Sequence, residues 1–260
     1  MIQRVTFIGA GNLATHLGKA FAKAGIQIVQ VYSRTLQSAG ALGAILDVPF
    51  TNVIDEIDPD ADLIVISVKD DVIGQILEQT DFRKRLIVHT AGSVSLDFLS
   101  PYSERCGVFY PLQTFSKGRE IDFSGVPVCL EANSTEILTE LKELAAKIST
   151  RVYEINSDDR KILHLAAVFA CNFVNHFYDI GAQLLKKQGL PFELLKPLIT
   201  ETAAKVMEMD PRDAQTGPAK RYDETIIKKH LKRMDDRPEI REIYRFISSS
   251  IYQAHKNNFA

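Results

Sequence analysis

Short apolar runs alternate with helical patterns from the start of the chain to about residue 156. The runs have the length of single strands, and we expect strands at residues 4–8, 27–32, 63–68, 86–90, 107–110, 126–131 and 152–155, with one short strand near 49–51. Between them, helical periodicity predicts helices at residues 11–24, 36–43, 71–79 and 135–148. Strands that alternate with helices are typical of βαβ units and a parallel sheet.

The pattern changes after Asn156. From there to the C-terminus only helical patterns occur, with interruptions at residues 189–191, 210–211 and 216–218. The sequence therefore predicts an α/β fold in two domains. Residues 1–156 form a Rossmann-type domain with a doubly wound, mostly parallel sheet, and residues 157–260 form an all-α C-terminal domain.

Composition and charge narrow the class of protein. The 260 residues are 45% hydrophobic, and 31 Lys and Arg against 33 Asp and Glu give a net charge of −2, which is typical of a globular protein and does not favour nucleic-acid binding. The three cysteines have neither metal-site nor redox-pair spacing. The longest apolar stretch, residues 162–174, is shorter than the ~20 residues that a bilayer needs. We expect a cytoplasmic protein without a signal peptide, metal site, nucleic-acid partner or membrane span.

A glycine-rich motif follows the first predicted strand and opens a helix. Its residues are Gly9, Ala10, Gly11, Asn12, Leu13 and Ala14, a G-x-G-x-x-A turn. Gly9 suits the tight turn, Gly11 lets a pyrophosphate approach the backbone, and Ala14 lets the helix lie close to the strand. The helix N-terminus offers free N–H groups and a positive dipole end to phosphates. The motif predicts dinucleotide binding, and the alternative is a structural glycine turn.

The end of the second predicted strand decides between NAD(H) and NADP(H). An NAD site usually has Asp or Glu at this position, where the carboxylate binds the ribose 2′-hydroxyl. This chain instead has Ser33, Arg34 and Thr35. A guanidinium makes paired, charge-assisted bonds to phosphate oxygens, and hydroxyls can add more. We therefore predict NADP(H), against the alternative that Arg34 is a solvated loop residue.

Ligands in open parallel sheets bind beyond the carboxyl ends of the strands. After the third and fourth predicted strands, the candidates for cofactor contact are Ser67, Val68, Thr90, Ala91 and Gly92. After the fifth, the candidates for substrate contact are Pro111 and Gln113. Small and hydroxylated residues suit a ribose and a nicotinamide that pass close to the backbone. The alternative at each position is an ordinary exit from strand to loop.

The helix predicted over residues 161–179 is apolar nearly all round, which predicts burial. At ~100° per residue, its polar side chains share one narrow stripe: Lys161, His164, Asn172, Asn175 and Asp179. Burial without partners would cost about 1–3 kcal/mol per group, so the stripe faces solvent, a polar surface or a ligand cleft. His164 is then the candidate proton donor, Lys161 and Asn172 are candidates for orienting the substrate, and Asn175 for contacting it. The alternatives are a structural histidine and an exposed lysine.

A polar segment at residues 216–223 presents Lys220, Arg221 and Asp223 after a turn. Arg221 is a candidate for binding an anionic group of the substrate. The alternative is a solvated loop or an ion pair between helices.

Together these motifs are similar to those of a two-domain family named for deazaflavin-dependent NADP oxidoreductases, in which a Rossmann-like domain precedes a helical domain of unknown function. The resemblance spans nearly the whole chain. It rests on residues 9–13, Ser33 and Arg34, residues 89–93, 111–115 and 164–170, Asn172, Gly217, Pro218, Arg221 and Asp223. It implies NADP(H) as cofactor, a deazaflavin as a candidate hydride partner, and a wider superfamily with pyrroline-5-carboxylate reductase, ketopantoate reductase and 6-phosphogluconate dehydrogenase.

The chain departs from these relatives at three positions. Tyr110 stands where the family has His, and Tyr222 stands where it has Gly. The hydroxy-acid dehydrogenases of the superfamily have Asn four residues after a Lys, whereas Lys161 is followed at that spacing by Leu165.

We therefore predict an NADP(H)-dependent oxidoreductase that transfers hydride to or from a small carbonyl or imine substrate. The helical domain is expected to close the substrate cleft, and the resemblance implies that it forms a homodimer. The alternative, from a different class, is a non-catalytic NADP-binding sensor or scaffold protein.

Overall fold

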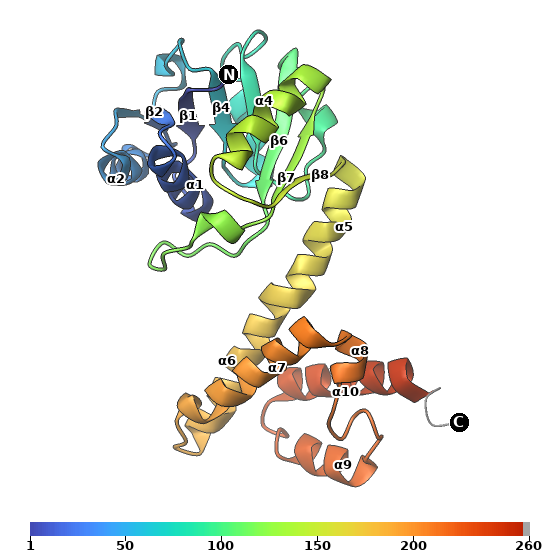
Figure 1. The fold of residues 1–260 in the computed structure, drawn as a ribbon. Coiled ribbons are helices and arrows are strands. Elements are labelled where there is room, and N and C mark those ends of the chain that lie inside the picture. The colour runs from blue at the N-terminus through green and yellow to red at the C-terminus, as the bar shows by residue number, and fades with distance from the viewer. Residues whose placement is uncertain (257–260) are drawn as a thin grey trace. The chain divides into compact units, whose positions relative to one another are not determined.

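The computed structural model of the protein describes residues 1–256 (Figure 1). Within these residues, an eight-stranded sheet has the order β3-β2-β1-β4-β5-β6-β7-β8. The strands are β1 (Arg4–Ile8), β2 (Gln27–Tyr32), β3 (Phe50–Thr51), β4 (Leu63–Ile66), β5 (Leu86–His89), β6 (Arg105–Pro111), β7 (Val128–Ala132) and β8 (Val152–Glu154). Neighbouring strands are parallel except β6 and β7. The predicted doubly wound, mostly parallel sheet is confirmed.

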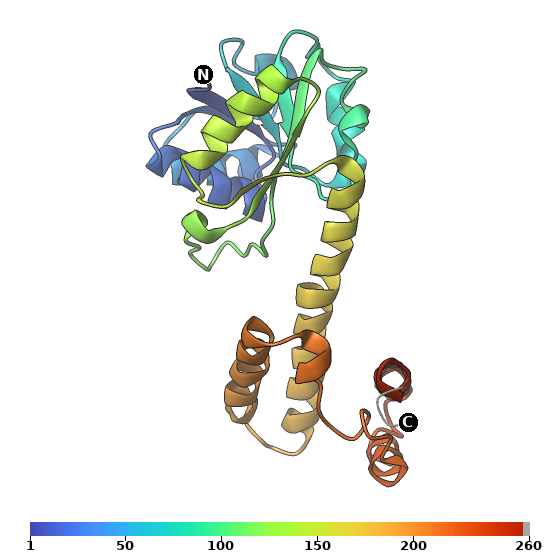
Figure 2. The same cartoon turned by 45° about the vertical axis from the view of Figure 1, so that its right-hand side comes forward.

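Helices cover both faces of this sheet because its buried strands are apolar on both sides. Along β1, Val5 and Phe7 belong to one hydrophobic core and Ile8 to the other. Residues of α1, α2 and α4 share the first core and residues of α3 share the second, and Figure 2 shows α4 lying across the sheet. The bounds are α1 (Asn12–Lys23), α2 (Leu36–Leu46), α3 (Ile73–Leu77) and α4 (Thr135–Ala146).

The strand order reverses around β1. The chain runs outward from β1 to β2 and β3 and then crosses to β4 on the other side of β1. In such sheets, ligands bind beyond the carboxyl ends of the strands at this switch point. The fold therefore places Ile8, the last residue of β1, and Ile66, the last residue of β4, at the edge of a binding crevice.

One predicted helix is shorter than expected. In place of a helix over residues 71–79, a 3₁₀ turn at Asp70–Val72 precedes α3, which ends at Leu77. β-Branched residues and glycine have weak helix propensity, and Val72, Ile73 and Gly74 occupy the start of this segment. The 3₁₀ turn starts close to the carboxyl end of β4, so it contributes Asp70 to the crevice.

The described chain is helical after β8. Asn156 caps α5 (Ser157–Ala167) by accepting a hydrogen bond from the Asp159 N–H at 2.9 Å. A π-helical segment, Val168–Phe173, then precedes the remaining helices. These are α6 (Val174–Lys187), α7 (Lys196–Glu208), α8 (Pro211–Ala214), α9 (Glu224–Lys232) and α10 (Pro238–His255). The chain forms two compact units, residues 1–171 and the residues from Asn172 onward.

The expected regular helix over residues 161–179 is interrupted, because residues Val168–Phe173 are π-helical. A π-helical turn accommodates about one extra residue, so the constant ~100° per residue that defined the polar stripe does not hold across this segment. In the single chain, Ile162 is 67% exposed and Leu165 is exposed as well. An apolar pattern predicts that a surface is buried, but it does not show whether the same chain or a second molecule buries it.

The second unit holds its helices together through side-chain contacts of its own. Tyr222 and Tyr252 stack with ring centroids 4.3 Å apart, and the Arg237 guanidinium donates to Gln183 Oε1 at 3.1 Å. Asp223 caps α9 by accepting from the Ile226 N–H at 3.1 Å.

Candidate functional site

The glycine motif between β1 and α1 has the geometry that a phosphate loop requires. Gly9 has a φ of +115°, and a Cβ there would lie 2.1 Å from the Ser67 carbonyl oxygen. A Cβ at Gly11 would meet no heavy atom within 4 Å, so the space beside this residue is open. Gly11 is also the N-cap of α1, and no side chain caps the helix. The first N–H groups of α1 are therefore free for an anionic ligand.

A cation and several hydroxyls lie where β2 meets α2. The Thr35 hydroxyl caps α2, accepting from the Ser38 N–H at 3.3 Å and donating to Ser38 Oγ at 2.8 Å. Arg34 is exposed, and within residues 1–256 no hydrogen bond or ion pair occupies its guanidinium. The guanidinium is free to bind a phosphate, whereas Thr35 is already committed to the helix cap.

A single cleft of about 800 Å³ brings most of the predicted residues together. The predicted residues that line it are Gly9, Ala10, Gly11, Asn12, Leu13, Ser33, Arg34, Thr35, Ser67, Val68, Thr90, Ala91, Gly92 and His164. Pro111, Gln113 and Lys161 are not among its lining residues. The Lys161 ammonium instead pairs with Asp158 at 3.2 Å on the surface. Asn172, Asn175 and Arg221 belong to the second unit.

The cleft also contains Tyr110, a residue at the carboxyl end of a predicted strand to which the sequence analysis assigned no role. The Tyr110 hydroxyl lies 2.9 Å from His164 Nδ1, and the two rings meet edge to face with centroids 6.1 Å apart. Burial raises the pKa of Tyr110 to about 12, so the hydroxyl remains a phenol at neutral pH. The only sequence signal was the unusual tyrosine at this strand end.

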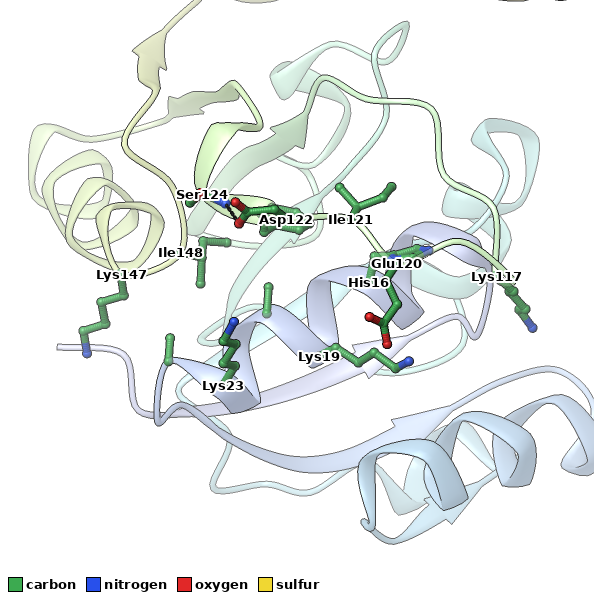
Figure 3. A pocket seen from close by; sticks show the side chains of 13 residues that line it. His16, Lys19, Lys23, Lys117, Glu120, Ile121, Asp122, Ser124, Lys147 and Ile148 are labelled. Carbon is green, nitrogen blue, oxygen red and sulfur yellow. Dashed lines mark hydrogen bonds between the residues drawn. The ribbon is translucent and has the colours of Figure 1, made fainter.

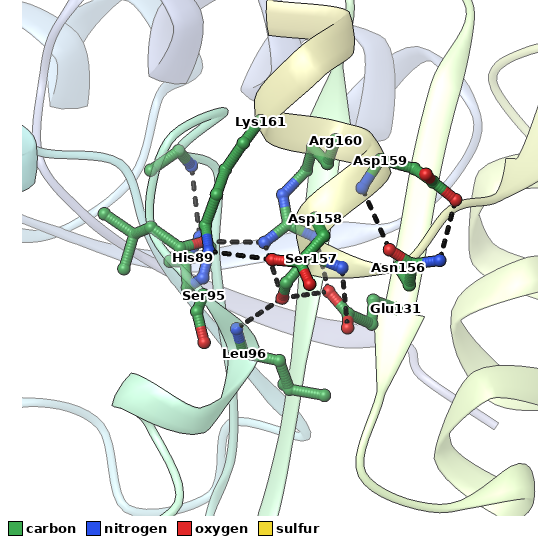
Figure 4. A network of polar contacts seen from close by, with 12 residues as sticks. His89, Ser95, Leu96, Glu131, Asn156, Ser157, Asp158, Asp159, Arg160 and Lys161 are labelled. Atoms are coloured by element: carbon green, nitrogen blue, oxygen red, sulfur yellow. Dashed lines mark hydrogen bonds and ion pairs between the residues drawn. The ribbon is translucent and has the colours of Figure 1, made fainter.

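A buried ion pair fixes the start of α5, one turn before His164 (Figure 4). Arg160 is fully buried and its guanidinium bonds to the Glu131 carboxylate on β7 and to the Val94 carbonyl oxygen at 2.5 Å. Ser157 donates from its N–H and hydroxyl to the same carboxylate at 3.0 and 2.7 Å, and its oxygen accepts from the Leu96 N–H at 2.9 Å. These bonds tie α5 to the sheet and thereby hold His164 at the cleft.

His89 supports the turn after β5 that lines this cleft. It is fully buried at the end of β5, and its Nδ1 accepts from the Ala91 N–H at 3.2 Å. Burial, aided by the charge of Arg160, lowers the pKa of His89 to about 4. The imidazole is therefore neutral and shapes the turn that carries Thr90, Ala91 and Gly92.

We expect this neutral histidine to make stability depend on pH. In the unfolded chain His89 takes up a proton below its ordinary pKa of 6.5, whereas in the folded chain it does so only near 4. Its contribution is complete above pH 6.5 and is lost as the pH falls to 4, which amounts to about 3 kcal/mol in free energy of unfolding. Denaturant unfolding at a series of pH values measures this loss.

Two variants separate this effect from general acid destabilisation. His89→Asn should remove most of the extra pH dependence between 6.5 and 4. His176→Asn, which alters an exposed histidine on α6, should leave it unchanged. Equal pH dependence in wild type and His89→Asn would show that His89 is not the group responsible.

A second hollow of about 470 Å³ lies beside α1, between Lys19, Lys23, Glu120 and Lys147 (Figure 3). It contains none of the predicted cofactor residues. Figure 3 shows the Lys117 and Lys147 side chains directed away from each other. The basic side chains therefore do not converge on one anion position.

Two family models match the chain. One, described as "NADP oxidoreductase coenzyme F420-dependent", covers residues 4–92, and the other, "Domain of unknown function (DUF2520)", covers residues 126–251. A comparison with curated proteins gives no match. Within residues 1–256, no helix is long and apolar enough to cross a membrane, and no group of three or more His, Cys, Asp or Glu side chains could hold a metal ion.

Solved structures resemble the chain over almost its entire length. A Bacteroides fragilis protein assigned provisionally to the NADP oxidoreductases is 47% identical, with a TM-score of 0.93 over 97% of this chain and 98% of that one. An imine reductase from Myxococcus stipitatus in complex with NADP⁺ is 18% identical, with a TM-score of 0.67 over 98% and 93%. A reductive aminase from Aspergillus terreus in complex with NADPH is 14% identical, with a TM-score of 0.76 over 99% and 95%. The last two show a shared fold.

Proposed function

The chain belongs to the family in which an F420-dependent NADP oxidoreductase domain precedes the DUF2520 domain, and from this membership we propose that it is an NADP(H)-dependent oxidoreductase acting on a small carbonyl or imine. One observation carries the proposal: a single cleft contains the open phosphate loop, the unoccupied Arg34 guanidinium and, from another part of the chain, His164. These groups match the phosphates and the reacting end of one dinucleotide.

The residues of the cleft fit NADP(H). The α1 N-terminus with Gly9 and Gly11 would hold the pyrophosphate, and Arg34 with Ser33 would hold the 2′-phosphate. Small residues after β4 and β5, including Ser67 and Gly92, would line the ribose and nicotinamide. When bound, the nicotinamide supplies or accepts the hydride.

In the proposed reaction, the protein itself donates a proton to the substrate. Hydride addition to a carbonyl or imine places negative charge on oxygen or nitrogen, and a positioned acid neutralises this charge by donating a proton. His164 Nδ1 is engaged by Tyr110, which leaves Nε2 to deliver the proton. Lys161, Pro111 and Gln113 do not line the cleft and Asn172, Asn175 and Arg221 belong to the second unit, so their contacts with the substrate stay predictions from the sequence.

Steady-state oxidation of NADPH tests this function. The panel contains keto acids, cyclic imines and a deazaflavin, because the family's name includes that coenzyme. We expect turnover with at least one carbonyl or imine. If NADPH binds but no member of the panel is turned over, the rival interpretation as a non-catalytic NADP-binding sensor or scaffold is favoured.

Arg34→Ala should weaken NADPH binding selectively. Loss of paired, charge-assisted bonds to the 2′-phosphate costs about 1.5–3 kcal/mol, or roughly 10–150-fold in Kd, while NADH has no phosphate at this position. Calorimetric titration of both cofactors measures the difference. Lys19→Ala, which changes a cation in the second hollow, is the matched control, and equal weakening of NADPH and NADH by Arg34→Ala would contradict the assignment.

We also propose a homodimer built mainly from residues beyond 156. Large apolar side chains stay exposed there, including Phe246 at 74% and Leu198 at 62%. Exposed apolar patches mark association sites, and most soluble oligomers are two-fold symmetric. Light scattering should give twice the 29.1 kDa chain mass, whereas a monomer at micromolar concentration would overturn the proposal.

A further inference from the structure

The imidazole of His164 has a defined partner for only one of its ring nitrogens. Nδ1 lies 2.9 Å from the Tyr110 hydroxyl, and within residues 1–256 no hydrogen bond is made by Nε2. Tyr110 lies near the end of β6, where the antiparallel pairing of Tyr110 with Cys129 and of Pro111 with Val128 fixes its backbone. The phenol is therefore held by the sheet, while the imidazole is held by α5.

Contact with Gly92 restricts the imidazole from another side. A Cβ at Gly92 would lie 2.6 Å from His164 Cγ, 2.6 Å from Nδ1 and 2.9 Å from Cβ. Real side-chain carbons do not approach this closely, so the ring occupies space that exists only because residue 92 is glycine. The Arg160–Glu131 pair fixes α5 one turn earlier, which limits how far the helix can move to relieve a clash.

A tyrosine hydroxyl can form a hydrogen bond with Nδ1 in either charge state of the imidazole. It donates to Nδ1 when the ring is neutral, and it accepts from the Nδ1–H group when the ring is an imidazolium. In the neutral ring whose Nδ1 accepts from the phenol, the single ring proton is on Nε2. In the imidazolium, both nitrogens are protonated and the Nε2 proton is the one that can be transferred to a substrate. Both cases keep Nδ1 occupied and Nε2 available.

We propose that Tyr110 is a positioning residue that engages His164 Nδ1 throughout the reaction, so that the proton exchanged with the substrate is always carried on Nε2. This inference rests on the proposed function, in which His164 is the proton donor. During reduction the Nε2–H bond of the imidazolium breaks and an O–H or N–H bond forms on the substrate. The electron pair stays on Nε2, the remaining proton stays on Nδ1, whose N–H group donates a hydrogen bond to the Tyr110 oxygen, and a proton taken up from the solvent later restores the imidazolium.

Nuclear magnetic resonance of ¹⁵N-histidine-labelled protein tests the contact without any substrate. At about pH 9, where an imidazole in water is neutral, the wild-type His164 ring should show one tautomer, with Nε2 protonated and Nδ1 a hydrogen-bond acceptor. Tyr110→Phe keeps the aromatic ring and removes only the hydroxyl, so the Nδ1 resonance should move and the single-tautomer signature should be lost. Tyr153→Phe, on the exposed edge of β8, should change neither nitrogen.

Turnover then tests the catalytic consequence. Tyr110→Phe should lower kcat about tenfold, as expected for one hydrogen bond to a charged group, with little change in NADPH affinity. In a His164→Ala background the same change should have no further effect, because the hydroxyl acts through the imidazole.

The outcomes distinguish this inference from the proposed function. Unchanged His164 ring nitrogens in Tyr110→Phe would overturn the contact, whether or not the protein reduces any substrate. Altered nitrogens with unchanged kcat, or additive effects of Tyr110→Phe and His164→Ala, would overturn the positioning role. If no substrate of the panel is turned over, the resonance measurement still decides whether Tyr110 controls the tautomer of His164.

Discussion

His164→Ala is expected to lower turnover by about 10²–10⁴-fold, the range that general acid catalysis supplies. The side chain lies at the edge of the cleft and is only half-buried, so the fold should tolerate its loss. The free energy of unfolding should therefore change by about 1 kcal/mol or less. NADPH affinity should also survive, because other residues hold the phosphates.

The melting temperature is measured before any assay, because it separates catalysis from structure. A large drop in melting temperature for His164→Ala would show that the histidine is a structural residue and would leave the reaction without a nominated acid. Normal stability with full turnover would exclude His164 as the proton donor. Only normal stability with greatly reduced turnover supports the proposed role.

Arg160→Met should cause the largest loss of stability that we expect. The guanidinium is fully buried and pairs with Glu131, and removal of one partner leaves the other charge without compensation. Breaking a buried pair in this way costs about 3–5 kcal/mol. Denaturant unfolding followed by circular dichroism measures the change.

Lys161→Met is the matched control for Arg160→Met. Lys161 is the next residue in α5 and also forms an ion pair, but both it and Asp158 are exposed. Exposed pairs contribute about 0–1 kcal/mol, so this variant should unfold close to the wild type. A similar small effect for Arg160→Met would mean that the buried pair does not anchor α5.

The sheet and most of the residues that line the cleft could be predicted because their signals are local. The bounds of β1 and β2 follow from the sequence pattern, and the motif from Gly9 to Ala14 specifies a turn within six consecutive residues. The place of Arg34 in the cleft could be predicted for the same reason, since it follows the end of a strand.

The end of the cleft that contains His164 depends on contacts between distant residues. Tyr110 and His164 are 54 positions apart, and no periodicity in either segment indicates that they meet. Gly92 was selected as a small residue for the cofactor, whereas the structure shows that it also makes room for an imidazole. Arg160 lies in the polar first turns of a helix, a position that usually faces solvent, and only the tertiary structure shows its burial.

The long helix shows a different limit of sequence reasoning. A constant turn of ~100° per residue assumes one kind of helix, but the π-helical segment Val168–Phe173 interrupts it without a proline or glycine. Its apolar pattern predicts burial, and in the single chain Ile162 and Leu165 are exposed. Periodicity predicts which surface is apolar, and it does not say which molecule covers that surface.

Calorimetric titration of the wild-type protein with NADPH and with NADH tests the central claim most directly. A free Arg34 guanidinium beside an open phosphate loop predicts saturable binding of NADPH that is about 10-fold or more tighter than that of NADH. Binding of neither cofactor, or tighter binding of NADH than of NADPH, would contradict the account.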